Sequence, residues 1–120
     1  MASTWSDRAR TRLSQLASAC NYEGWDSYGA TALRAEALEY ADKLVDVLSV
    51  RIIDVHGEAY APQITPLNAG GIQFEWGTPA GCVELEVYGP NCVEILLQRE
   101  GGDPLCNDSL VDLLKKVLEL

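Results

Sequence analysis

Apolar residues recur at helical spacing in two stretches of the first half of the chain. Between residues 5 and 20 one side of the predicted helix is apolar, and Thr4 and Asp7 can pair as its N-terminal cap. Between residues 31 and 48 a second helix is predicted, with a long apolar face opposite a mostly acidic one. The acidic face consists of Glu36, Glu39, Asp42, Lys43 and Asp46.

Strict alternation of apolar and polar residues replaces the helical spacing in the second half. Residues 72–76, 82–88 and 92–98 alternate and are separated by turns rich in Gly and Pro, which predicts an antiparallel meander of three strands. Pro62 and Pro66 flank a shorter stretch that suits an edge strand or an extended loop. Residues 50–56 fit either a short strand or the tail of the second helix, and residues 108–120 are predicted to form a last helix.

This order of elements, α-α-(β)-β-β-β-α, predicts an α+β fold in which three helices pack on one face of a small antiparallel sheet of three to four strands. A length of 120 residues suits a single domain over residues 1–120. No apolar run is long enough for a membrane span, and the first residues lack the apolar stretch of a signal peptide. We therefore expect a cytoplasmic protein.

Acidic residues outnumber basic ones, and the formal net charge is −9. Only the first twenty residues are net positive, through Arg8, Arg10 and Arg12. A strongly negative surface repels phosphate groups and anionic lipids, so we expect no direct binding to nucleic acid or membranes. The partner that such a surface attracts is basic, and solubility alone is the alternative explanation of the charge.

The alternation places four glutamates on one face of the predicted sheet. If the apolar residues of the three strands face the helices, the opposite face displays Glu75, Glu84, Glu86 and Glu94, with Gln73 and Gln98 beside them. Residues 72–98 contain no Lys or Arg. Keeping the apolar faces in register places Glu94 opposite Glu86 or Glu84 at about 5 Å, where like charges are destabilising. This cost favours a binding role, and a face that is acidic by chance is the alternative.

The chain lacks the motifs of the common catalytic and cofactor sites. It has no GxxxxGK(S/T), GxGxxG or GxSxG sequence, and its single histidine, His56, is interpreted as a polar residue at the end of an element. The four cysteines form no CxxC pair, so we expect buried free thiols and no cofactor. We expect no catalytic activity. A carboxylate-dependent enzyme using Glu84 and Glu86, or a weak calcium site on clustered acids, stays open.

Two aromatic residues lie in the loop that precedes the second helix. Trp25 and Tyr28 belong to residues 25–30, WDSYGA. Because Trp and Tyr anchor many protein interfaces, this loop is a candidate partner-binding site. The alternative is a loop folded onto the core beside Trp76.

Three segments, WDSYGA (25–30), PQITP (62–66) and GGIQFEW (70–76), resemble a group of small uncharacterised bacterial and phage proteins over about residues 22–98. Their shared pattern is W-(D/N)-x-(Y/G)-G-A, then P-x-(I/V)-x-P, then G-G-I-x-(L/F)-E-W. The resemblance implies no activity and transfers no functional residue. In size and acidity the chain is also similar to phage anti-CRISPR proteins, several of which act as DNA mimics.

From these observations we expect a non-catalytic interaction protein that blocks a basic nucleic-acid-binding surface of a partner in the bacterial cytoplasm. An anti-CRISPR-type phage inhibitor acting as a DNA mimic is the most concrete version. Its contact residues would be the four sheet glutamates, together with Glu36, Glu39, Asp42 and Asp46 of the second helix. The alternative binding protein is of the antitoxin or immunity type and uses Trp25 and Tyr28.

Overall fold

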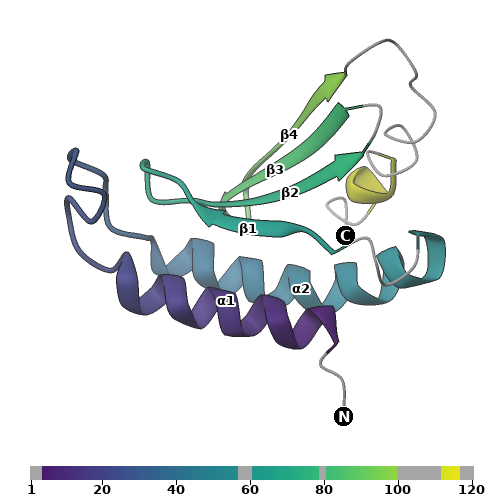
Figure 1. Cartoon of the computed structure of the whole chain (residues 1–120), viewed down its shortest axis with the longest axis horizontal. Helices are drawn as coiled ribbons and strands as arrows, with labels where there is room; N and C mark the ends of the chain where they lie inside the picture. Colours follow the sequence, from purple (N-terminus) through teal and green to yellow (C-terminus); the bar gives the residue numbers. More distant parts are fainter. Residues whose placement is uncertain (1–3, 57–60, 79–80, 100–111, 117–120) are drawn as a thin grey trace.

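Helices and strands follow one another in the predicted α+β order. The computed structural model describes residues 4–56, 61–78, 81–99 and 112–116. Its elements are α1 (Trp5–Ala19), α2 (Ala35–His56), β1 (Gln63–Pro66), β2 (Ile72–Thr78), β3 (Gly81–Gly89) and β4 (Cys92–Arg99), and residues 112–116 are a further helical segment. The strands form one antiparallel sheet in the order β1-β2-β3-β4, with α1 and α2 side by side beneath it (Figure 1). The predicted meander on a layer of helices is therefore confirmed.

The first helix lies close to its predicted limits, because the N-terminal cap and the buried apolar face define the same stretch of chain. The Thr4 side chain accepts a hydrogen bond of 3.3 Å from the backbone N–H of Asp7, which satisfies one of the free amides of the first turn. At the other end the Cys20 N–H donates to the Leu16 carbonyl oxygen at 2.9 Å. The buried face between these ends consists of Trp5, Ala9, Leu13 and Leu16.

The predicted start of the second helix, at residue 31, is wrong, because residues 31–34 are not helical. Their amides bond elsewhere: the N–H of Leu33 donates to the Cys20 carbonyl at 2.9 Å, and that of Arg34 to the Gly70 carbonyl at 3.0 Å. Residues 50–56 continue the helix, since one more turn brings Ile52 into the core. Among the described residues no helix combines the length and apolar character that a membrane crossing needs.

The inner face of the sheet, turned toward the helices, carries the apolar residues of the alternating strands. The buried ones are Ile64, Ile72, Phe74, Trp76, Val83, Leu85 and Val87. They form one core cluster with the buried faces of α1 and α2, and Leu114 of the segment 112–116 belongs to the same cluster. Burying each large apolar side chain contributes about 1.5–3 kcal/mol. Val93 and Ile95 of β4 share the predicted phase but are only partly buried, as β4 lies farthest from α1 and α2 (Figure 1).

The strand β1 is the edge of the sheet beside α1, which confirms the edge-strand reading of the proline-flanked stretch. It is short, with Pro62 before it and Pro66 as its last residue. Proline has no N–H to donate and is therefore tolerated at an edge. The Arg12 side chain of α1 reaches this strand, where its Nε donates to the Ile64 carbonyl oxygen at 2.9 Å.

Candidate functional site

The face of the sheet turned away from the helices carries the polar residues of the same alternation. We call this surface the outer sheet face, and its described residues on β2, β3 and β4 are Gln73, Glu75, Cys82, Glu84, Glu86, Tyr88, Cys92, Glu94 and Leu96. All four predicted sheet glutamates belong to it, since their neighbours along each strand point into the core. Glu94 is exposed, and the other three glutamates are half-buried.

The strand register sets these glutamates directly opposite one another. Glu75 on β2 is the cross-strand partner of Glu84 on β3, and Glu86 on β3 is the partner of Glu94 on β4. Of the two registers predicted for Glu94, the pairing with Glu86 is the one adopted, and Glu84 faces Leu96 instead. Directly opposed side chains have Cβ atoms about 5 Å apart, where like charges destabilise a sheet. The outer sheet face therefore contains two adjacent pairs of repelling carboxylates.

No cation stands beside these four carboxylates in the described part of the chain, where both ion pairs involve Arg10 of α1. Glu75 accepts a hydrogen bond of 3.3 Å from the Gln73 side-chain amide, which is neutral. Glu75, Cys82 and Glu84 each offer a ligand atom, all within 4.8 Å of one another, so these residues could hold a divalent cation. Clustered acidic groups also adopt this spacing without an ion.

Tyr88 extends the outer sheet face beyond Glu86 on β3. Its ring lies over Gly71, so closely that a Cβ added at Gly71 would be 2.6 Å from the Tyr88 Cε1 atom. Burial raises the pKa of Tyr88 above 10.0, and the charge of Glu86, a side-chain hydrogen bond to Glu86 and the charge of Glu94 raise it further. At neutral pH the Tyr88 hydroxyl is therefore protonated.

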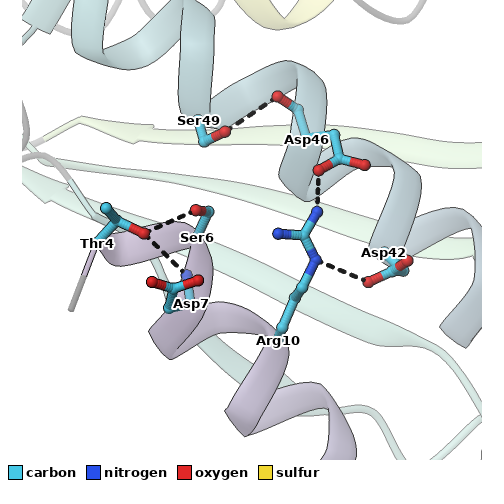
Figure 2. Close-up of polar contacts among 7 residues, drawn as sticks. All are labelled: Thr4, Ser6, Asp7, Arg10, Asp42, Asp46 and Ser49. Atoms are coloured by element: carbon cyan, nitrogen blue, oxygen red, sulfur yellow. Dashed lines mark hydrogen bonds and ion pairs between the residues drawn. The ribbon is translucent and has the colours of Figure 1, made fainter.

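The acidic residues of α2 lie on a different side of the molecule. The helix packs its apolar face against the inner sheet face and exposes Glu36, Glu39, Asp42 and Asp46, of which Glu36 approaches Gly89 at the end of β3. Figure 2 shows the guanidinium of Arg10 between two of them: its Nε is 3.4 Å from Asp42 Oδ1, and its Nη2 pairs with Asp46 Oδ1. The structure thus divides the eight predicted contact carboxylates into two surfaces.

Tyr28 is displayed at the tip of the loop between α1 and α2. Its side chain is 92% exposed. The loop is held in one shape by the Asp26 carboxylate, which accepts backbone hydrogen bonds from Tyr28 at 2.8 Å and Ala30 at 3.0 Å. Ser27 has a φ of 66°, a left-handed conformation that costs a residue other than glycine about 1 kcal/mol. The loop therefore holds the most exposed of the large hydrophobic side chains among the described residues on a strained, hydrogen-bonded turn.

Trp25 has a different environment from Tyr28. It is partly buried and packs against the core cluster. Its Nε1 donates to the Thr31 carbonyl oxygen at 2.9 Å, which ties the loop to the residues before α2. Trp25 and Tyr28 were predicted together as one candidate binding site, but Trp25 packs against the core and only Tyr28 is exposed.

Cys82 and Tyr88 belong to the outer sheet face, although sequence reasoning did not select them as site residues. Both occupy the same alternate positions as Glu84 and Glu86, and this spacing was the available signal. The expectation of buried thiols holds for Cys20 and is wrong for Cys92, which is exposed because it lies on the outward positions of β4. Cys106 lies outside the described residues, and Cys20 and Cys92 are free thiols.

Two hollows of the described surface lie along α1. The larger, of about 340 Å³, is lined by Asp7, Arg8, Thr11, Arg12 and Gln15. The smaller, of about 90 Å³, lies between α1 and β1 beside Trp5 and Pro62. Neither of these two is lined by the glutamates of the outer sheet face.

Comparisons of the chain with protein-family models, curated proteins and solved structures found no match.

Proposed function

We propose that the protein is a non-catalytic binding protein that presents the outer sheet face to a basic surface of another protein. The observation that carries this proposal is the pair of like-charge contacts, Glu75 with Glu84 and Glu86 with Glu94, with no described cation beside them. Such contacts cost stability. A surface shaped for solubility alone mixes charges of both signs, so binding is the gain that offsets this cost.

The partner is a protein whose basic surface binds nucleic acid. Closely spaced carboxylates on a firm scaffold present negative charge as the phosphates of a nucleic acid strand do. A groove lined by Arg and Lys would take the outer sheet face in place of its nucleic acid. The most concrete version is inhibition of a CRISPR effector by a phage-encoded DNA mimic. Association would be fast and salt-sensitive, since opposite charges steer the encounter.

The test removes charge from one acidic surface at a time. The first variant carries Glu84→Gln, Glu86→Gln and Glu94→Gln. The matched control carries Asp7→Asn, Glu23→Gln and Asp112→Asn, which removes three exposed charges outside the outer sheet face and outside the acidic face of α2. The wild-type chain and both variants are compared in two assays. In the first, each protein is added to purified CRISPR effectors and the binding of target DNA is measured. In the second, each protein is immobilised and used to capture proteins from a bacterial lysate.

We expect the wild-type chain and the control to block DNA binding and to retain the same partner at low salt. High salt and added duplex DNA should release that partner. The sheet variant should lose at least about tenfold in affinity, because three desolvated charge contacts are absent. A folded sheet variant that inhibits and captures as the wild type does would exclude the outer sheet face as the binding surface.

A second candidate function, binding of the antitoxin or immunity type, is favoured by the 92% exposure of Tyr28 on a hydrogen-bonded loop. Tyrosine is among the residues that dominate interface energies. In this case Tyr28→Ala would weaken partner capture by about tenfold or more, and the captured partner would resist high salt. Tyr22→Ala is the control, since Tyr22 is also exposed and precedes the hydrogen-bonded turn.

A further inference from the structure

One end of the outer sheet face combines an aromatic ring with a carboxylate pair. Tyr88 follows Glu86 on β3 by two residues, at the point where the β3–β4 register shifts, and its side chain lies near the Glu86 and Glu94 carboxylates. Glu94 lies directly opposite Glu86 on β4. The Tyr88 ring packs closely over Gly71, which restricts its movement. This end therefore holds two carboxylates beside a ring that has little freedom to turn away.

Its counterpart at the other end of the face is chemically different. There Glu75 and Glu84 form the like-charge pair, and the neighbouring residue of β3 is Cys82 in place of an aromatic. Both ends carry the same charge, so they attract any cation equally at long range. They differ in what a planar cation can contact once it has arrived.

A guanidinium group suits the end that holds the tyrosine. It is planar, stacks on aromatic rings and presents several N–H donors in a fixed fork that matches carboxylate oxygens. Placed between Glu86 and Glu94, it would relieve the repulsion of that pair while its plane or edge contacts the Tyr88 ring. A lysine ammonium is a compact, strongly hydrated charge and gains less from the ring.

We propose that Tyr88, Glu86 and Glu94 form a docking site for an arginine side chain of the protein partner. This inference rests on the proposed function and narrows it, because it assigns the anchor residue on the partner's basic surface. Arginine-lined grooves become the preferred targets, and lysine-lined grooves of equal charge the weaker ones.

The experiment compares two short capped peptides of equal length and charge, one with arginine and one with lysine at every basic position. Binding to the full chain is followed by NMR shifts of the Tyr88 ring and by titration at low salt. We expect the arginine peptide to bind about fivefold more tightly, which is the size of one exposed cation–π contact. The Tyr88 ring signals should shift with that peptide.

Two double glutamine variants of equal charge and two Tyr88 variants locate the arginine preference within the outer sheet face. Glu86→Gln with Glu94→Gln should reduce the arginine preference to less than about twofold, and Tyr88→Val should do the same. Glu75→Gln with Glu84→Gln should keep the preference, as should Tyr88→Phe, which retains the ring. If Tyr88→Val does not fold, the two double glutamine variants still test the proposal.

Equal affinity for the two peptides in the wild-type chain would overturn the arginine site and leave the proposed function standing. A preference that survives in the Glu86/Glu94 variant and disappears in the Glu75/Glu84 variant would overturn it as well. Binding of neither peptide at low salt would contradict both proposals.

Discussion

On α2, Asp42 and Asp46 share the guanidinium of Arg10, whereas on the outer sheet face each glutamate of a pair has a second glutamate as its cross-strand neighbour. The two surfaces have the same residue chemistry and similar numbers of acids. They differ in whether a described residue supplies the opposite charge. The two paired aspartates help to hold α1 against α2, and the glutamates have no cation beside them within the described part of the chain.

The comparison also shows why net charge alone identifies no site. The value of −9 counts both surfaces equally. Arg10 lies 36 positions before Asp46 in the chain, so only the packing of the two helices shows that these charges meet. Helix packing brings opposite charges together on α2, whereas the strand register brings like charges together on the outer sheet face.

We expect the largest change in stability from Gly71→Ala, because the added methyl group would clash with the Tyr88 ring that packs over Gly71 on the outer sheet face. The new Cβ would lie 2.6 Å from the Tyr88 ring and 2.8 Å from the Val87 carbonyl oxygen, and the backbone oxygen cannot easily move. We expect a loss of about 2 kcal/mol in the free energy of unfolding, measured with urea. Gly77→Ala is the control, because nothing lies within 4 Å of its added Cβ. A Gly71→Ala variant as stable as the control would mean that the ring does not need this close contact.

Removing charge from the outer sheet face should stabilise the fold. The triple variant Glu84→Gln, Glu86→Gln and Glu94→Gln relieves both like-charge pairs, each of which costs about 0.5 kcal/mol. We expect a gain of about 1 kcal/mol in the free energy of unfolding at low salt, which shrinks as salt is added. A loss of stability would show that these carboxylates have favourable partners within the fold.

Removing Arg10 should have the opposite sign and a smaller size. Its two ion pairs are exposed, with side-chain exposures of 58% and 66% for the aspartates, so solvent screens them. Arg10→Gln should cost about 0.5 kcal/mol at low salt and almost nothing at high salt. The cost should vanish in a chain that already carries Asp42→Asn and Asp46→Asn. An undiminished cost there would assign the role of Arg10 to packing instead of charge.

We expect the smallest change in stability at alkaline pH, and we assign it to Tyr88 of the outer sheet face. The pKa of Tyr88 is raised above 10.0 in the fold, first by burial and then by Glu86. Above that pH the unfolded chain releases the tyrosine proton while the folded chain keeps it, so stability falls as the pH rises. Between about pH 9 and pH 11 the melting temperature should fall further in the wild type than in Tyr88→Phe. Parallel curves would show that Tyr88 titrates as an ordinary surface tyrosine.

The sheet could be predicted from the sequence because one signal determined both its faces. Alternation with period two fixed which side chains of residues 72–98 point inward, and pairing of the apolar faces left few registers for Glu94. The same alternation also places Cys82 and Tyr88 on the outer sheet face. Tyr88 was not predicted as a site residue because only the acidic residues of the sheet were considered as candidates.

The start of α2 could not be predicted from local pattern. The apolar spacing of residues 31–48 continues smoothly through Leu33, yet the Leu33 amide bonds to Cys20 and that of Arg34 to Gly70. These bonds join segments far apart in the sequence and replace the first turn of the helix. The end of α2 at His56 agrees with the interpretation of that residue as the end of an element.

Sheets grow when another chain adds a strand to an unprotected border. At β1 the Ile64 carbonyl oxygen is already taken by Arg12, and Pro66 contributes no amide hydrogen. An incoming strand would therefore find few hydrogen-bonding groups free on this side. The guanidinium of Arg12 and the imino acid Pro66 thereby close one common route to aggregation at this edge.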